Sequence, residues 1–298
     1  MENNTARLQR VRPGRKGRTL RNPVTPYMFL LPFLGMLGLF MLYPIIYSIV
    51  ISFMRFRAGE FTFFGLSNYK FLIQDQAFHK AILNTIRILL IQVPIQTFMA
   101  VVLATFMNDI RVKLRGLWRM FIFMPVLIDT VSYALVFGLL FNQREGFINS
   151  LLRINVQWFN EAIPATALII MAVTWRWTGY NAIIILAGLQ NIGNDLYEAA
   201  SIDGCNRVKQ FIHITLPGAK PVILFSVIFS INGVLQLFTE PNLLTRGGPA
   251  GATETIVSYL YQIGFTQFNF GLASAGAYVL AIMIAVVTGL QFRLQKEE

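Results

Sequence analysis

The sequence is poor in the residues that soluble enzymes use for catalysis and metal binding. Its 298 residues include one cysteine, two histidines and 14 acidic residues, and charged residues make up 13% of the chain, against about 25% in ordinary soluble domains. The lone Cys205 excludes an intramolecular disulfide. No cluster of histidine, cysteine and acidic residues has the spacing of a metal site. No catalytic nucleophile with a general base can be recognised in the sequence either. We therefore expect no catalytic residue and no metal ligand in this chain.

Two common means of driving transport are also missing. No G-x-x-x-x-G-K-[ST] loop is present to hold the phosphates of ATP with backbone amides. The apolar segments contain no ladder of carboxylates of the kind that proton-coupled carriers use as relays. The sequence therefore predicts no cofactor in this chain and disfavours a secondary carrier or a membrane-embedded enzyme.

What the chain has in quantity is long apolar segments. Hydrophobic residues make up 55% of it, and six segments come close to the roughly 20 residues that cross the hydrocarbon core of a bilayer. Because backbone polar groups must be satisfied internally in lipid, we expect each segment to be a helix. The sequence therefore predicts an all-α integral membrane protein with six transmembrane helices. The six segments cover residues 27–53, 82–106, 121–141, 165–189, 222–238 and 271–290.

Positive charge is concentrated in alternate connections between these segments. Of the 25 Lys and Arg residues, 16 lie before the first segment, after the sixth, or in the second and fourth connections, whereas seven lie in the others. The positive-inside rule then places both termini and the fourth connection in the cytoplasm. We divide the chain into a basic cytoplasmic tail (1–25), a first transmembrane helix with its external loop (26–80), and a core (81–294) with a cytoplasmic loop (191–220).

The basic tail has a simpler explanation than nucleic-acid binding. A run of Arg, Lys, Gly and Pro beside a membrane helix orients that helix and is attracted to anionic lipid. We therefore predict membrane lipid, and no nucleic acid, as a partner of the tail. Pro44, Pro94 and Pro125 fall within apolar segments, where each is expected to kink its helix, as a structural wedge rather than a gating hinge.

The cytoplasmic loop 191–220 contains signals for two short helices. Asp195 and Glu198 fit a capping box at the start of the first helix. Gly204 interrupts it, because Gly is unfavourable inside a helix and readily takes a left-handed turn. A second helix is expected to begin near Asn206 and to stop before Pro217. The loop should therefore form a compact knob on the membrane face.

A few polar side chains fall at membrane depth, where a central charge costs roughly 2.5–3.5 kcal/mol. We therefore expect these side chains to face a cavity or each other. Arg87 lies near the end of its helix, so its side chain should extend to the membrane–water interface. Asp129 could form an ion pair with Arg176. Aromatic rings beside amide and guanidinium donors are suited to binding a sugar. A belt of aromatic residues at the membrane–water interface would produce the same sequence pattern. The candidate substrate path consists of Trp175, Arg176, Trp177, Tyr180, Asn181 and Asn232.

The loop also resembles the "EAA" loop of bacterial ABC importer permeases. It has Glu-Ala-Ala at 198–200, a Gly four residues after the second Ala, and an Ile-x-Leu-Pro sequence at 214–217. Other stretches are similar to carbohydrate-uptake permeases, closest to the maltose-type and glycerol-phosphate-type first subunits, and the similarity covers residues 26–294. These stretches are Phe64-Gly65-Leu66-Ser67-Asn68-Tyr69, which reads as a turn, Leu140-Phe141-Asn142, Gly146-Phe147-Ile148-Asn149-Ser150-Leu151, and Gly247-Gly248-Pro249 before Thr253-Glu254-Thr255.

The resemblance implies the type I ABC importer permease fold and half of a translocation pathway for a sugar across the bacterial cytoplasmic membrane. It implies a second, usually distinct, permease subunit, two ATPase subunits that carry ATP and Mg²⁺, and an extracellular or periplasmic sugar-binding protein. A phosphate-bearing substrate such as glycerol phosphate would require a cluster of basic residues at membrane depth, and Arg176 and Arg87 are only two. The sequence therefore favours a neutral mono- or oligosaccharide as the substrate over glycerol phosphate. The residues that would contact the ATPase are Glu198, Ala199, Ala200, Asp203, Gly204, Leu216 and Pro217.

Overall fold

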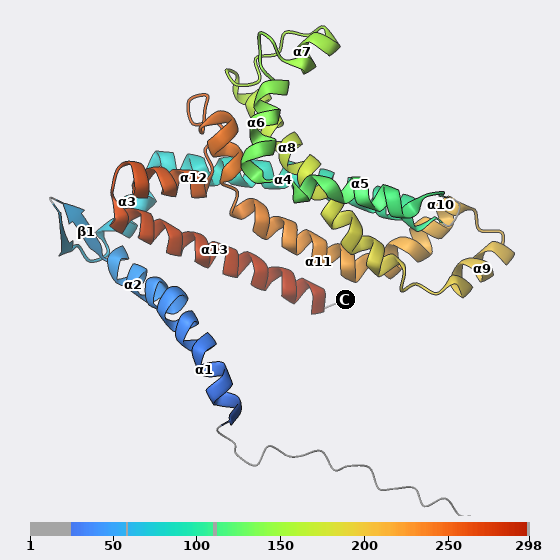
Figure 1. The fold of residues 1–298 in the computed structure, drawn as a ribbon, viewed down its shortest axis with the longest axis horizontal. Helices are drawn as coiled ribbons and strands as arrows, with labels where there is room; N and C mark the ends of the chain where they lie inside the picture. Colours follow the sequence, from blue (N-terminus) through green and yellow to red (C-terminus); the bar gives the residue numbers. More distant parts are fainter. Residues whose placement is uncertain (1–24, 58, 110–111, 297–298) are drawn as a thin grey trace, which may run out of the picture. The chain divides into compact units, whose positions relative to one another are not determined.

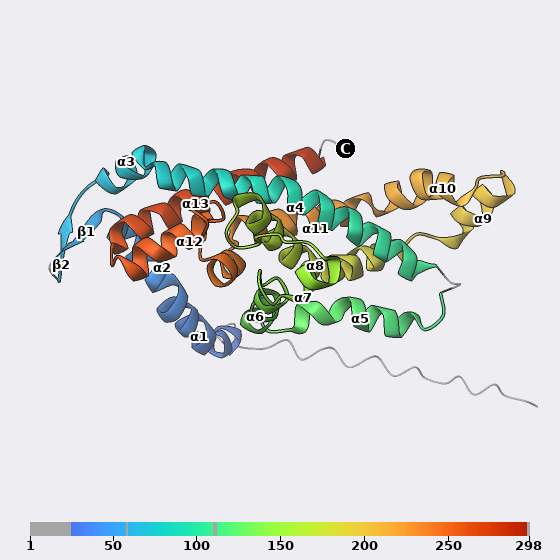
Figure 2. The ribbon, with the colours of Figure 1, turned by 90° about the horizontal axis from the view of Figure 1, so that it is seen from above.

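The computed structural model describes residues 25–57, 59–109 and 112–296, and most of this part of the chain is helical (Figures 1 and 2). By its internal contacts the chain divides into two compact units, Met1–Ser48 and Ile49–Glu298. The predicted basic tail, apart from Thr25, lies outside the described residues. The predicted all-α class holds with one exception, a two-stranded hairpin after the first helix.

The first apolar segment forms a single helix with a wide turn in its middle. Helices α1 (Thr25–Leu37) and α2 (Tyr43–Ser52) are joined by a π-helical turn, η1 (Gly38–Leu42). The N–H of Tyr43, the residue before Pro44, donates to Gly38 O, five residues back. A proline ring clashes with the carbonyl four residues before it and removes one N–H, and the wider turn accommodates both. The helix is long and apolar enough to cross a membrane.

In the second unit, α8 (Ala162–Leu189) is the central helix. It packs against α4 (Gln76–Asn108), α5 (Arg115–Leu127) and α11 (Leu216–Leu235). Of its most apolar stretch 67% is buried, against 33% or less for the other continuous spans. Small side chains permit this: a Cβ on Gly179 would lie 1.7 Å from Ile122 O of α5, and one on Gly188 would lie 2.6 Å from the Val222 side chain of α11. The last span, α13 (Phe270–Lys296), packs on α11.

The third apolar segment, predicted as one helix over 121–141, is broken. Helix α5 ends at Leu127, α6 (Thr130–Leu140) begins three residues later, and the two are bent by 94°. Ile128 is extended, and the Asp129 carboxylate accepts from the N–H groups of Val131 (3.0 Å) and Ser132 (3.2 Å). Asp129 therefore caps α6, and it forms no ion pair with Arg176. Within the part of the chain that the structure describes, the predicted six spans become five continuous helices and this bent pair.

The connections hold several short elements. After the first helix, β1 (Met54–Arg57) and β2 (Glu60–Phe63) form an antiparallel hairpin, and α3 (Ser67–Gln74) begins within the stretch predicted to be a turn. The hairpin and α3 are joined because the Asn68 amide donates to the backbone oxygens of Ser52 (2.8 Å) and Met54 (2.9 Å). The remaining short elements are α7 (Phe147–Leu152), η3 (Pro241–Thr245), α12 (Ile256–Tyr261) and η4 (Gln262–Thr266).

The loop between η3 and α12 is fastened to the first turns of α4. The Asn84 side-chain amide donates to Gly251 O (2.8 Å) and Glu254 O (3.0 Å), and the ammonium group of Lys80 donates to Ala250 O (2.6 Å). Thr85 Oγ1 accepts from the N–H of Ile256 at 3.1 Å. This loop is thereby held next to η3, which directly follows Thr239 and Glu240 in the wall of the cavity described below.

Candidate functional site

The loop between α8 and α11 forms two short helical pieces around Gly204 (Figure 1). Helix α9 (Asn194–Ile202) ends there, and α10 (Arg207–Gln210) follows. Gly204 has φ +75°, so the predicted left-handed turn is confirmed. Its N–H donates to Ser201 O (3.2 Å), and the N–H of Cys205 donates to Ala200 O (2.9 Å). This pair of bonds is the Schellman ending of a helix, which satisfies carbonyls that would otherwise lack partners.

Two details of this loop differ from the prediction. Helix α9 is capped by the extended residue Gly193 without a side-chain bond, so the capping box between Asp195 and Glu198 is wrong. Asp195 instead lies in the first turn, where a negative charge is favourable beside the helix N-terminus. The second helix does not stop before Pro217, because α10 continues through the π-helical turn η2 (Phe211–Thr215) into α11.

The wide turn η2 explains how the helix passes Pro217. The N–H of Leu216 donates to Phe211 O, five residues back, which repeats the arrangement that precedes Pro44 in the first helix. Pro217 lies inside this continuous helix, directly after the wide turn, and the wider turn accommodates both its ring and its missing N–H. The loop is therefore continuous with the fifth span through one helix.

Side-chain bonds hold α9 against this continuous helix. The hydroxyl groups of Tyr197 and Thr215 lie 3.0 Å apart, and the Gln210 amide donates to Ser201 Oγ at 2.8 Å. Of the seven predicted ATPase-contacting residues, Ala200 is buried by this packing, and the other six are exposed. They are Glu198, Ala199, Asp203, Gly204, Leu216 and Pro217.

Other large apolar side chains on the loop are also exposed, and the sequence analysis did not select them. Ile202 is 87% exposed, and Leu196 and Val208 are exposed as well. Contiguous apolar patches mark interaction sites, and these side chains are candidates for one. Only the structure identifies them, because helical periodicity alone does not tell which face of α9 packs on α10.

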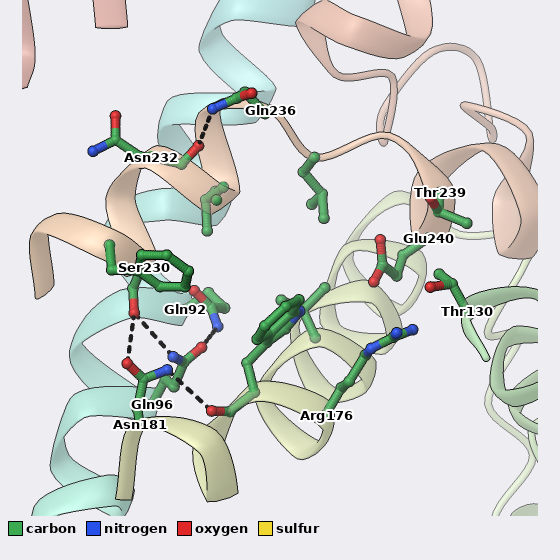
Figure 3. A pocket seen from close by; sticks show the side chains of 16 residues that line it. Gln92, Gln96, Thr130, Arg176, Asn181, Ser230, Asn232, Gln236, Thr239 and Glu240 are labelled. Atoms are coloured by element: carbon green, nitrogen blue, oxygen red, sulfur yellow. Dashed lines mark hydrogen bonds between the residues drawn. The ribbon is translucent and has the colours of Figure 1, made fainter. Parts of the chain in front are cut away.

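A second site lies among the spans themselves. A cavity of about 340 Å³ is bounded by α4, α8, the C-terminal half of α11 and the residues around η3 (Figure 3). Four of the six predicted substrate-path residues line it, namely Arg176, Trp177, Asn181 and Asn232. Trp175 does not line it and instead packs on Phe137 of α6, with ring centroids 5.4 Å apart. Tyr180 lies behind the lining, 5.8 Å from the ring of Trp177 and 5.7 Å from that of Phe229.

One side of the cavity is a chain of buried amide and hydroxyl groups. Gln92 donates to Gln96, whose amide donates to Ser230 Oγ at 3.0 Å, and Ser230 and Ser226 donate to the Asn181 side-chain oxygen at 3.5 and 2.5 Å. Figure 3 shows Gln92, Gln96, Asn181 and Ser230 gathered at this side. The chain ties α4, α8 and α11 together. Sequence reasoning selected only Asn181, because a lone Gln or Ser within an apolar helix costs too little to stand out.

The other side carries two buried charged groups. Arg176 is 8% exposed and Glu240 is 5% exposed, and both line the cavity next to Thr130 (Figure 3). The Tyr133 hydroxyl donates to a Glu240 carboxylate oxygen, and the Arg176 guanidinium lies 4.7 Å from the centroid of the Tyr133 ring. Within the described residues, Arg176 Nε and Nη1 have no hydrogen-bond partner.

Glu240 was missed because it lies two residues beyond the predicted end of the fifth span. The available signal was an acidic residue immediately before Pro241 and between apolar stretches. Asn232 was selected as a substrate contact, but its side-chain amide is engaged elsewhere. It donates to Ile228 O (2.9 Å) and accepts from the Thr288 hydroxyl of α13 (3.1 Å), so it joins α11 to α13.

The fold and these two sites agree with comparisons to known proteins. Residues 96–297 match the family described as "binding-protein-dependent transport system inner membrane component", and the chain belongs to this family. It is 39% identical to the lactose transport system permease protein LacF of Rhizobium radiobacter, over 92% of this chain and 95% of that protein. It is 38% identical to the arabinooligosaccharides transport system permease protein AraP of Bacillus subtilis strain 168, over 90% and 88% of the two chains.

A solved structure has the same fold. In the crystal structure of a bacterial alginate ABC transporter in complex with an alginate pentasaccharide-bound periplasmic protein, one chain matches with a TM-score of 0.80 and 22% identity, over 91% of this chain and 94% of that chain. The predicted family and the type I ABC importer permease fold are therefore confirmed. The protein is a multi-pass membrane permease subunit of an ABC importer that works with a binding protein.

Proposed function

We propose that this subunit forms half of the translocation path for a neutral sugar, and that the cavity beside Arg176 is the part of the path that contacts it. The observation that carries the proposal is the lining of the cavity. Trp177 and Phe229 offer ring faces, the amide chain offers donors and acceptors, and Arg176 and Glu240 add one charge of each sign. Sugars need both kinds of contact, because their C–H faces are apolar and their hydroxyl groups must be hydrogen-bonded.

The balance of charge supports a neutral cargo over glycerol phosphate. The positive charge of Arg176 is matched by the negative charge of Glu240 in the same cavity. Arg87, the other cation at membrane depth, lines a separate groove between α4 and α8 together with Lys80. A phosphate group would therefore meet one guanidinium and a repelling carboxylate. The names of the lactose and arabinooligosaccharide relatives also support a sugar, of either one or several units.

Energy would enter through the loop around Gly204. We infer that α9 seats in a groove of a separate ATPase subunit, which holds ATP and Mg²⁺, and that Ile202, Leu196 and Val208 provide apolar contact there. Because α10, η2 and α11 form one continuous helix, movement of the loop would tilt α11, which lines the cavity. Rigid-body movement around a central site is the usual basis of alternating access.

The assembled transporter would contain a second permease subunit, two ATPase subunits and an extracellular or periplasmic sugar-binding protein. The distribution of positive charge supports placing the loop around Gly204 and both termini in the cytoplasm of a bacterium. The bilayer would then be the bacterial cytoplasmic membrane.

Reconstitution of the whole transporter in proteoliposomes would test the proposal. ATP hydrolysis and uptake would be measured with neutral mono- and oligosaccharides and with glycerol 3-phosphate, in the presence of the binding protein. We expect a neutral sugar to stimulate both activities. Stimulation by glycerol phosphate alone, or uptake that follows an ion gradient after ATP is depleted, would contradict it.

A further inference from the structure

The guanidinium of Arg176 is charged, buried and incompletely bonded. Arginine keeps its charge in proteins and presents five N–H donors in a fixed plane. The Arg176 Nε and Nη1 atoms, although 92% of the residue is buried, lack an acceptor within the described part of the chain. Such a donor is expensive to leave unpaired, and Arg176 lines the cavity. The missing acceptors are therefore groups that a bound molecule can supply.

Glu240 presents the complementary chemistry at the same wall. An ionised carboxylate only accepts hydrogen bonds and has about four positions for them, of which Tyr133 occupies one. Glu240 and Arg176 do not pair with each other, since the ion pair found within the described residues is Arg207–Asp109. Tyr133 contacts both side chains and holds them in place. The wall thus offers fixed donors next to fixed acceptors.

We propose that Arg176 and Glu240 together bind a vicinal diol of the substrate, that is, two hydroxyl groups on neighbouring carbons of one sugar ring. The carboxylate accepts the two O–H hydrogens, and the guanidinium donates to the hydroxyl oxygens. This assignment rests on the proposed function and narrows it to a substrate with an unmodified diol at this ring. It also means that Glu240 rejects an anionic sugar whose carboxylate would take the place of the diol, since like charges repel in a buried site.

The assignment predicts that loss of either hydroxyl weakens transport more than one ordinary hydrogen bond would. A sugar that lacks one of these hydroxyl groups leaves a buried charge without its partner. Sites built around a substrate hydroxyl discriminate strongly against analogues without it for this reason. We expect about a tenfold to hundredfold rise in the half-saturating concentration for the deoxy or O-methyl analogue at the diol, consistent with bonds to charged groups. Analogues modified elsewhere on the ring should lose less.

The assignment of the diol to Arg176 and Glu240 can be tested in the reconstituted transporter by measuring each protein variant with each sugar analogue, as in a double-mutant cycle. The transported sugar, its deoxy and O-methyl analogues and a derivative with an O-carboxymethyl group at the diol would be compared in the wild type and in Glu240→Gln and Arg176→Gln, with sugar-stimulated ATP hydrolysis as the readout. Because the same binding protein is used throughout, its own preferences cancel in the cycle. Glu254→Gln and Arg87→Gln are matched controls, since neither residue lines the cavity.

In Glu240→Gln, the parent sugar should be transported less well, and the penalty for removing the diol hydroxyls should shrink but not vanish, because Arg176 still donates to their oxygens. The O-carboxymethyl derivative should gain relative to the parent in this variant. In Arg176→Gln the penalty should shrink in the same way, and what remains should come from Glu240. The control variants should keep the wild-type pattern. If Glu240→Gln lowers transport of every analogue by the same factor, Glu240 is only structural and the assignment is overturned. If no sugar stimulates the wild type, the proposed function itself fails, which is a different outcome.

Discussion

The hydroxyl of Tyr133, on α6, donates a hydrogen bond to the carboxylate of Glu240, which lies between α11 and η3. These residues are more than 100 positions apart in the chain. The bond connects the second half of the broken span to the end of the fifth span, at the wall of the cavity. It makes the position of Glu240 depend on α6.

The variant Tyr133→Phe should weaken both the fold and substrate recognition. It leaves the Glu240 carboxylate buried without one donor, which costs about 1–3 kcal/mol of folding stability. We expect a lower thermal midpoint of the purified transporter and weaker stimulation of ATP hydrolysis by sugar. Tyr261→Phe, which removes an exposed hydroxyl in α12, is the control. Equal thermal midpoints for Tyr133→Phe and the wild type would show that the bond is not important.

Substitutions at Gly204 should uncouple hydrolysis from uptake without preventing membrane insertion. The left-handed conformation costs an L-residue about 1–2 kcal/mol, whereas Asn tolerates it better. Gly204→Val should therefore lose most uptake and Gly204→Asn should retain more, whereas Gly204→Asp should lose uptake because it adds a negative charge to the exposed turn. A charge reversal at Glu198 should also abolish uptake, since it changes an exposed residue of α9. Uptake at wild-type level in Gly204→Val would contradict the role of the turn.

Cross-linking can locate the surface that contacts the ATPase. In a Cys205→Ser background, single cysteines at Ile202 and Ala199 should be captured by an ATPase subunit in native membranes. A cysteine at Ala200 should not, because Ala200 is buried against the neighbouring helix. Capture at Ala200 but not at Ile202 would mean that the loop docks through a different face.

The close approach of α5 and α8 should make Gly179 intolerant of any side chain. A Cβ there would meet Ile122 O at 1.7 Å, so Gly179→Ala must displace a helix backbone, and overpacking of this kind costs about 1–3 kcal/mol or more. Gly138→Ala in α6 is the matched control, because nothing lies within 4 Å of its added Cβ. Expression and thermal midpoint should fall for Gly179→Ala alone. Similar values for both variants would contradict the packing described.

The loop that is fastened to α4 should respond to pH through Glu254. Burial raises the pKa of this carboxyl above its ordinary 4.5, while the positive charge of Lys80 lowers it and Asp75 adds to the rise. The folded state then binds its proton more readily than the unfolded state, so stability falls as pH rises through the folded pKa. Glu254→Gln mimics the protonated form. It should raise the thermal midpoint at neutral pH, and the difference should disappear below about pH 4.

Much of the fold could be predicted because lipid constrains the sequence strongly. An apolar stretch of about 20 residues must be helical in a bilayer, so the positions of the spans followed from hydropathy. The bend at residues 128–129 did not, because it depends on Asp129 capping α6 rather than staying within a helix. The hairpin Met54–Phe63 was missed for a similar reason, since its pairing depends on contacts between distant residues such as Asn68 and Met54.

The candidate sites could be predicted only in part. Arg176, Trp177 and Asn181 were selected because polar and aromatic groups at membrane depth are costly and therefore stand out. Gln92, Gln96 and Tyr133 were not, since their importance lies in which helix faces meet around the cavity. The exposed Ile202 was not selected either, because an isoleucine in a short helix is as readily buried as exposed.

By itself the sequence determined that the chain spans a membrane repeatedly, that one polar loop carries the Glu-Ala-Ala pattern, and that it belongs with the importer permeases. The spans follow from local composition, on which hydration and lipid solvation act residue by residue, whereas the family follows from the resemblance of that loop and its neighbouring stretches to known permeases. Only the tertiary structure decided that Arg176 and Glu240 lie on the same wall of a cavity, that Tyr133 contacts both, and that the loop continues into α11 as one helix. Those relationships join residues from different helices, and packing, rather than local preference, brings them together.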